Sequence, residues 1–320
     1  MANNILDKIS GAISIGIAGH VRPDGDCVGS CMAMFLYLGK RYPEAKIDVY
    51  LEMVPEVFHY IKGIDSVHTS YETDKQYDVF IALDCGDLER LGDAGTLYVN
   101  AKNTINIDHH ISNTKFADVN YVLPDASSTC ETLYTIFEQE DIDKHIATAL
   151  YTGIVHDTGV FKHSNTSAQT MRIAGDLLSH DIPFSKIIDE SFYQKTYVQN
   201  QLLGRCLTES ILVLDGKCIV STISQKTMEF YGARPKDIDG IIDQLRVTKG
   251  VEVALLLHET GTQQYKVSMR SNNQVDVSKI AVYYGGGGHV KAAGVTMQGT
   301  AYDVINNITT MIYQQLQELS

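Results

Sequence analysis

The chain has 320 residues, 44% of them hydrophobic and 20% charged, and because one hydrophobic core rarely organises so many, we expect a globular protein of two domains. The opening residues show neither a signal-peptide pattern nor an apolar run long enough to span a bilayer, which predicts a cytoplasmic protein with no membrane partner. The net charge is −13, and residues 201–320 hold 11 basic and 11 acidic side chains, so the first 200 residues carry the whole acidic excess. Such a surface excludes tight binding to long duplex nucleic acid.

The first half of the chain alternates short apolar runs with helical patterns. Strands are predicted over residues 13–19, 46–52, 78–84 and 104–108. Helices are predicted over residues 30–41, 128–139, 142–155 and 168–180. Alternation of this kind is typical of an α/β fold in which helices cover both faces of a mostly parallel sheet.

The second half has a different order of elements. A polar helical stretch, residues 190–205, separates the two halves without any strand pattern. Strands then follow over residues 217–223, 251–258 and 265–270, with helices over 237–245, 277–284 and 302–316. We therefore expect a catalytic domain over 1–188, a helical connector over 189–207, and a smaller α+β domain over 208–320 across a cleft.

Four short polar motifs stand where predicted strands or helices end, which is the usual place for sites in open α/β sheets. Each motif alone has a structural explanation, because a turn, a helix N-cap at Asp26 or a helix end closed by Gly159 uses the same residue types. Four such coincidences in one chain favour a shared site. The motifs are His20 to Asp26, Asp84 to Asp87, Asp108-His109-His110 and His156 to Gly159.

The residue types in these motifs indicate a particular metal chemistry. Mixed imidazole and carboxylate ligands suit Mn²⁺ or Fe²⁺, whereas Mg²⁺ and Ca²⁺ prefer oxygen alone and structural zinc prefers thiolates. The six cysteines form no CxxC pair, so a zinc framework is not indicated. Two ions about 3.5–4 Å apart would need a shared carboxylate, and they would activate water and stabilise both oxygens of a phosphoryl transfer.

A glycine-rich segment in the second half offers a candidate phosphate site. Gly285 to Gly288 precede His289, and four glycines let backbone N–H groups approach a phosphate closely. The residues after them resemble a helix start, which favours anions, although a hinge or turn explains glycine runs equally well. Arg270 and Ser271 end the strand upstream, and a guanidinium there either binds phosphate or is a solvated surface charge.

Taken in order, these motifs closely resemble the DHH/DHHA1 phosphoesterase superfamily over nearly the whole chain. The resemblance implies that His20 and Asp24 bind a first metal, that Asp26, His109 and Asp157 bind a second, and that Asp84 bridges the two. His110 would lie near the scissile phosphate, as ligand support or substrate contact. In the second domain the matching substrate-binding residues are Arg270, Ser271, Gly286, Gly287, Gly288 and His289. His156 departs from some relatives, and the sequence leaves open whether it tunes the second metal or caps its helix.

The compact length is most similar to the oligoribonuclease and 3′-phosphoadenosine 5′-phosphate (PAP) phosphatase branch of that superfamily. This resemblance implies two Mn²⁺ ions, with Mg²⁺ or Fe²⁺ as substitutes, and hydroxide attack on short RNA, linear dinucleotides or PAP. The sequence leaves open whether the protein forms a homodimer. A family-II-like inorganic pyrophosphatase is one alternative, since it shares the first-half motifs, and a non-catalytic nucleotide sensor is another.

Overall fold

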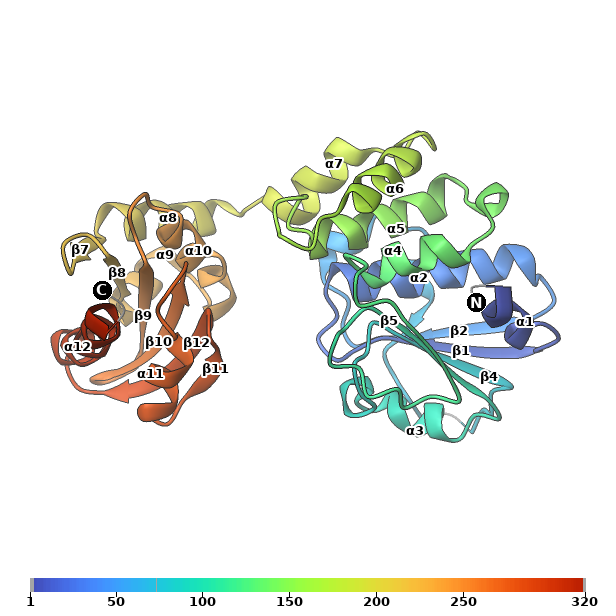
Figure 1. Ribbon diagram of the computed structural model, residues 1–320, viewed down its shortest axis with the longest axis horizontal. Helices are drawn as coiled ribbons and strands as arrows, with labels where there is room; N and C mark the ends of the chain where they lie inside the picture. Colours follow the sequence, from blue (N-terminus) through green and yellow to red (C-terminus); the bar gives the residue numbers. More distant parts are fainter. Residues whose placement is uncertain (1–2, 73, 319–320) are drawn as a thin grey trace. The chain divides into compact units, whose positions relative to one another are not determined.

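A computed structural model describes residues 3–72 and 74–318 of the chain (Figure 1). Its internal contacts divide into two compact units between Gln194 and Lys195. This division falls inside the stretch 189–207 that the sequence predicted as a connector. Over the described residues, we find no helix whose length and apolar character would let it cross a membrane.

The first unit is built on a wholly parallel sheet whose strands lie in the order β3-β2-β1-β4-β5-β6. The strand order reverses between β1 and β4, and such a switch point is where open α/β sheets bind ligands. The central strands are continuous apolar runs because both of their faces are covered. The strands are β1 (Ser14–Ala18), β2 (Lys46–Tyr50), β3 (Val67–His68), β4 (Val79–Leu83), β5 (Thr104–Asp108) and β6 (Val119–Val122).

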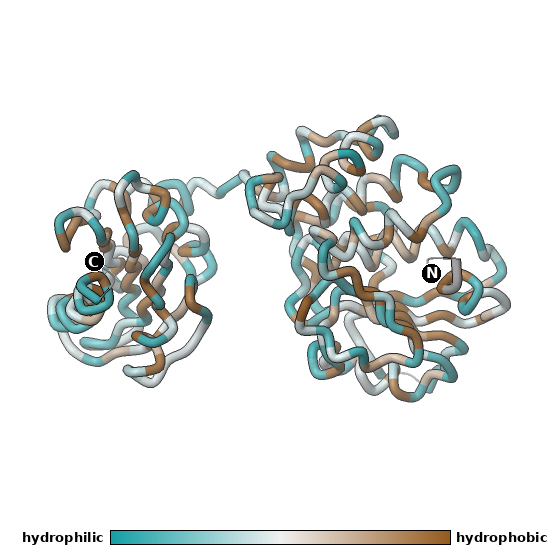
Figure 2. Tube along the Cα trace, in the orientation of Figure 1, coloured by the Kyte–Doolittle hydropathy of each residue, from teal (hydrophilic) through white to brown (hydrophobic). Residues whose placement is uncertain are grey.

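Helices cover both faces of this sheet, which confirms the predicted α/β fold. The larger core lies under α2, α4, α5 and α6, and a smaller core on the opposite face is closed by α3. Figure 2 shows apolar residues concentrated along the strands between these layers. The helices are α1 (Asn3–Ile9), α2 (Gly25–Arg41), α3 (Ala94–Val99), α4 (Thr129–Ile136), α5 (Lys144–Asp157), α6 (Ala168–Leu178) and α7 (Phe184–Ile188).

The start of α2 differs from the prediction. The helix begins at Gly25, five residues before the predicted start, and its N-cap is Asp24 and not Asp26. The Asp24 carboxylate accepts the backbone N–H groups of Asp26 and Cys27, both at 3.1 Å. The apolar periodicity that marks a helix begins only after this first turn, because the turn carries polar site residues.

The second unit is a mixed sheet in the order β11-β12-β10-β9-β8-β7. β8 and β9 are parallel, and the other neighbouring pairs are antiparallel. One core lies under α11 and α12, and a second lies on the other face under α8, α9 and α10. The elements are α8 (Tyr197–Thr208), β7 (Ile211–Val213), β8 (Cys218–Ile223), α9 (Gln225–Tyr231), α10 (Ile241–Arg246), β9 (Val253–Gly261), β10 (Gln264–Ser271), α11 (Val277–Tyr283), β11 (Gly287–His289), β12 (Ala292–Gln298) and α12 (Ala301–Glu318).

Three sequence predictions for this half were wrong. The helix over 190–205 is interrupted, since a π-helical turn ends at Tyr193 and α8 starts at Tyr197. The helix over 237–245 starts only at Ile241, because Gly240 before it adopts a left-handed conformation. The residues after the glycine run do not start a helix: they form β11 and β12.

Candidate metal centre

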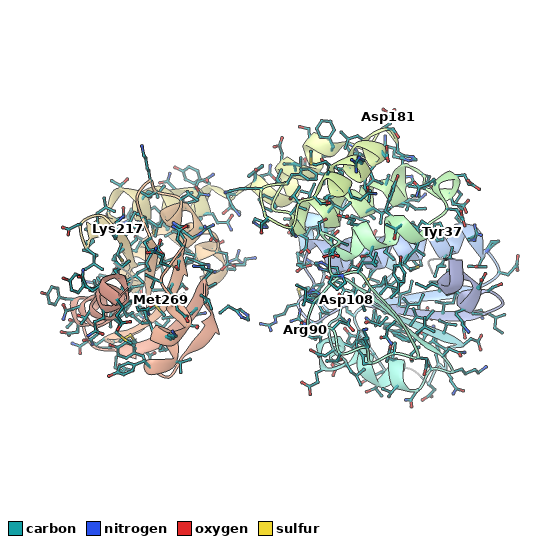
Figure 3. All side chains as sticks on the ribbon, viewed as in Figure 1. Tyr37, Arg90, Asp108, Asp181, Lys217 and Met269 are labelled. Atoms are coloured by element: carbon teal, nitrogen blue, oxygen red, sulfur yellow. The ribbon has the colours of Figure 1, made fainter. Side chains whose placement is uncertain are left out.

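The fold brings four polar segments to the carboxyl edge of three adjacent strands. His20 follows β1, Asp84 follows β4 and His109 follows β5, while Asp157 ends α5, which packs above the sheet. Figure 3 labels Asp108, the last residue of β5, in the same region of the first unit. We call the residues gathered here the Asp–His cluster, namely His20, Asp24, Asp26, Asp84, His109 and Asp157.

One side of the cluster is formed around His20. Its Nε2 atom lies 3.4 Å from Asp84 Oδ2 and 3.6 Å from Asp24 Oδ2. Its Nδ1 atom lies 2.9 Å from the backbone oxygen of Val21, so Nδ1 carries a proton in either charge state and Nε2 is the atom available to a metal ion once its own proton is displaced. A backbone carbonyl that orients the imidazole in this way is the usual support of a metal-binding histidine.

The other side is formed around His109. Its Nε2 atom lies 3.1 Å from Asp157 Oδ2 and 3.7 Å from Asp84 Oδ1, and its Nδ1 faces the backbone oxygen of Ala126 at 3.3 Å. Asp26 completes this group, since ligand atoms of Asp26, His109 and Asp157 lie within 4.8 Å of one another.

Asp84 lies between the two sides. Its Oδ2 faces His20, while its Oδ1 faces His109 and accepts the hydroxyl hydrogen of Thr129 at 3.0 Å. Only 3% of the side chain is exposed, and the backbone has φ +58°, a strained conformation for a residue other than glycine. Such strain at the end of a strand is typical of functional positions.

Asp26 is held by the start of α4. The backbone N–H of Thr129 donates to its Oδ2 at 2.6 Å, and that of Cys130 donates to its Oδ1 at 3.0 Å. Gly153 on α5 makes room for this contact, because a Cβ there would collide with Asp26 and with the Cys130 thiol. The helix N-terminus stabilises the carboxylate charge.

The electrostatics of the Asp–His cluster fit cation binding. Burial raises the pKa of Asp26 well above its ordinary value, and the charges of Asp84 and Asp157 raise it further. Although burial opposes protonation of His20, its hydrogen bonds to Asp24 and Asp84 raise its pKa to about 11. In the protein without metal, protons are thus drawn to this site to offset the crowded carboxylates. Divalent cations would do the same, so the mixed nitrogen and oxygen donors fit a metal such as Mn²⁺ or Fe²⁺.

Cys27 also has a sulfur near His20 and Asp84. Burial raises the pKa of this thiol well above its ordinary value, and its Sγ lies 3.8 Å from the backbone oxygen of His20. The side chain is fully buried and packs in the core under α2, so we assign Cys27 to packing and do not count it in the Asp–His cluster.

His110 differs from His109 because a carboxylate supports it. Its Nδ1 lies 2.7 Å from Oδ1 of the fully buried Asp108, and Asn113 donates to the other oxygen of Asp108 at 2.6 Å. The Asp108 hydrogen bond raises the pKa of His110. The ring is 41% exposed, so His110 can present a positive charge and an N–H group to a bound anion.

His156 lies outside the Asp–His cluster. Its ring packs edge-on against Phe58 and Phe192, and its Nε2 lies 2.9 Å from Ser191 Oγ. Burial lowers the pKa of His156 to about 4, which keeps the ring neutral. The structure thus gives His156 a packing role between α5 and the π-helical turn near residue 191.

The predicted substrate residues of the second unit share one face of its sheet. Arg270 on β10 is aligned with Ala292 on β12, which is aligned with His289 on β11, and aligned residues of neighbouring strands point to the same face. Gly286 and Gly288 permit close strand approach, because a Cβ on either would collide with the backbone of β12. Ser271 points to the other face and donates to Glu252.

Sequence reasoning missed the residues that support the site. Thr129 was predicted only as part of a helix start, and no pattern links it to Asp84. Asn113 falls in a loop with no motif of its own. Asp108 belongs to a recognised motif, but only the structure shows that it orients His110.

Two family models match the chain, one in each compact unit. The model of the DHH family N-terminal domain matches residues 14–154, and that of the DHHA1 domain matches residues 215–318. The first range contains every residue of the Asp–His cluster except Asp157, and the second contains the strands that carry Arg270 and His289.

Particular relatives span almost the whole chain. It is 29% identical to the bifunctional oligoribonuclease and PAP phosphatase NrnA of Thermus thermophilus, over 93% of this chain and 88% of that protein. It is 26% identical to the protein of the same name from Bacillus subtilis, over 93% of each. An exopolyphosphatase-related protein from Bacteroides fragilis has the same fold, with a TM-score of 0.84 over 99% of this chain, 95% of that chain and 23% identity.

Proposed function

We propose that this hydrolase of phosphate esters uses two divalent cations, Mn²⁺ with Mg²⁺ or Fe²⁺ as substitutes, to act on small nucleotides. Short oligoribonucleotides and linear dinucleotides would be cut to mononucleotides, and PAP would yield AMP and phosphate. The names of the Thermus and Bacillus relatives support this substrate class, since both are called oligoribonuclease and PAP phosphatase.

One observation carries the proposal. The two oxygens of Asp84 face two different imidazoles, His20 at 3.4 Å and His109 at 3.7 Å. A carboxylate with one oxygen toward each of two ligand groups is what a pair of metal ions about 3.5–4 Å apart requires. Asp24 would complete the first group, and Asp26 and Asp157 the second.

The protein residues around the ions have separate tasks. When bound, divalent ions would stabilise the negative charge that develops on the phosphate oxygens. His110, held by Asp108, donates a hydrogen bond from its exposed edge to the scissile phosphate. In the second domain, Arg270 and His289 bind substrate phosphate, and a guanidinium can do so through two parallel hydrogen bonds.

The direct test is hydrolysis by the purified full chain with Mn²⁺. PAP, a linear dinucleotide, a cyclic dinucleotide, an RNA 5-mer and pyrophosphate would be assayed side by side. We expect turnover of PAP, the linear dinucleotide and the RNA 5-mer, and little turnover of pyrophosphate. Cleavage of pyrophosphate alone would refute the substrate class, and nucleotide binding without turnover would refute the enzymatic role.

Asp84→Asn should abolish this turnover while leaving the fold intact. Asp118→Asn is a matched control, because Asp118 also accepts a threonine hydroxyl, that of Thr104 at 2.8 Å, but lies at the opposite end of the sheet before β6. The control should retain wild-type activity. Near-normal Mn²⁺-dependent activity in the Asp84 variant would contradict the bridging role.

A further inference from the structure

Two arginines of the second domain share one carboxylate. Asp243 Oδ1 lies 3.6 Å from Nε of Arg246 and 3.7 Å from Nε of Arg270. Each arginine side chain is 33% exposed and the aspartate is 48% exposed, so solvent reaches the group. Two positive charges beside one negative charge leave a net charge of about +1 within the protein's own residues.

The fold fixes Arg246 beside Arg270. Arg246 ends α10, which packs through Ile242 and Leu245 on the sheet face that also carries Arg270. Its NH1 donates to Asn272 Oδ1 at 3.0 Å, and the Asn272 amide donates back to the Arg246 backbone oxygen at 3.0 Å. The arginine is therefore oriented before any ligand arrives.

A small residue lies beside Arg270 on the side toward His289. The aligned neighbour of Arg270 on β12 is the half-buried Ala292, which extends only one carbon from the backbone, whereas its neighbour on β9, Ala254, is buried under α10. His289 lies one strand beyond Ala292 on the same face. On this face, Ala292 is therefore the aligned residue that lies between Arg270 and His289.

The chemistry of this group favours a phosphate monoester. A terminal phosphate carries about −1.5 to −2 charges at pH 7, against −1 for a phosphodiester, so two guanidiniums match it better. A carboxylate and a phosphate present oxygens of similar spacing to a guanidinium. Asp243 therefore marks, within the protein itself, where an anion binds.

We propose that Arg246 and Arg270 form a subsite for a terminal, non-reacting phosphate of the substrate, and that this phosphate displaces Asp243. The proposal rests on the proposed function in assuming a nucleotide substrate, and it adds a preference for nucleotides that carry a second phosphate. Arg246 and Asp243 are then specificity residues, outside the Asp–His cluster.

Binding to the metal-free full chain tests the subsite without any turnover. Calorimetry would compare 5′-AMP with adenosine for the wild type, Arg246→Gln and Arg234→Gln. Loss of a partly exposed charge-assisted contact should weaken 5′-AMP binding roughly tenfold in Arg246→Gln and leave adenosine binding unchanged. Arg234 is a matched control, because it pairs with Asp237 at 3.7 Å in the same domain but is 69% exposed. Equal 5′-AMP affinity in all three proteins would overturn the subsite.

Asp243→Asn separates a binding role from a structural one. Removing the competing carboxylate should tighten 5′-AMP binding severalfold, opposite to the effect of Arg246→Gln. Weaker binding in both variants would overturn the proposal, because it would mean that the three side chains merely support the fold.

Steady-state kinetics with Mn²⁺ test the proposed substrate preference. Arg246→Gln should raise KM for a 5′-phosphorylated dinucleotide more than for its 5′-hydroxyl counterpart, with kcat little changed. Equal effects on both substrates would overturn the preference. Absence of turnover in the wild type would refute the proposed function instead, and the 5′-AMP comparison would still decide the subsite.

Discussion

Thr129→Val removes one hydroxyl hydrogen bond from the Asp84 carboxylate and keeps the side-chain shape. Thr129 is fully buried, its hydroxyl lies 3.0 Å from Asp84 Oδ1, and its backbone N–H to Asp26 is unaffected by the change. A hydrogen bond to a charged group contributes about 1.5–3 kcal/mol, and loss of a residue that supports a metal ligand typically costs about 10–100-fold in metal affinity. We expect the free energy of unfolding without metal to fall by about 1.5–3 kcal/mol. We also expect Mn²⁺ affinity to fall at least tenfold.

Urea unfolding in EDTA and calorimetric titration with Mn²⁺ measure these two effects. Thr152→Val is the matched control, because Thr152 is also buried and its hydroxyl is hydrogen-bonded at 2.9 Å, but to the hydroxyl of Tyr60. The control should lose stability and keep its Mn²⁺ affinity. If both variants bind Mn²⁺ as the wild type does, Thr129 does not position a metal ligand and the reasoning fails.

Three further predictions concern single side chains. Gly153→Ala should destabilise the first domain by about 1–3 kcal/mol in urea unfolding, because its Cβ would collide with Cys130; Gly175→Ala on α6 meets nothing within 4 Å and should be neutral or stabilising. Glu252→Gln should lower the thermal midpoint of the second domain, since this buried carboxylate accepts several backbone N–H groups of the loop after β10, and an unchanged midpoint would contradict that role. His156 has a pKa of about 4 in the folded protein against about 6.5 unfolded, so the unfolded state binds the proton first and stability falls as pH falls through this range. In EDTA, the stability of the wild type relative to His156→Gln should fall by about 2 kcal/mol from pH 7 to pH 5, and a constant difference would show that the ring titrates normally.

Four strands of the parallel sheet and their polar ends were accessible from the sequence because each of the four is a short apolar run that stops at a polar residue, whereas the short edge strands β3 and β6 were missed. The same logic failed at the glycine run before His289. Glycines that permit close strand approach have the same sequence as glycines that precede a helix start, and only the pairing of β11 with β12 separates the two. Helix starts were misplaced for a related reason, because the first turn of α2 carries Asp26 for the site and no apolar residue pattern.

The supporting contacts were inaccessible because they join residues far apart in the chain. Thr129 reaches Asp84 across 45 positions, and Asp26 reaches the start of α4 across more than 100. No local periodicity encodes such pairs. Their existence follows from the strand order, which places β1, β4 and β5 side by side.

Anomalous diffraction at the manganese edge, from crystals of the full chain grown with Mn²⁺, tests the central claim most directly. The account predicts two peaks about 3.5–4 Å apart, one beside each oxygen of Asp84, with His20 on one ion and His109 on the other. A single peak, or two peaks that do not share Asp84, would contradict it.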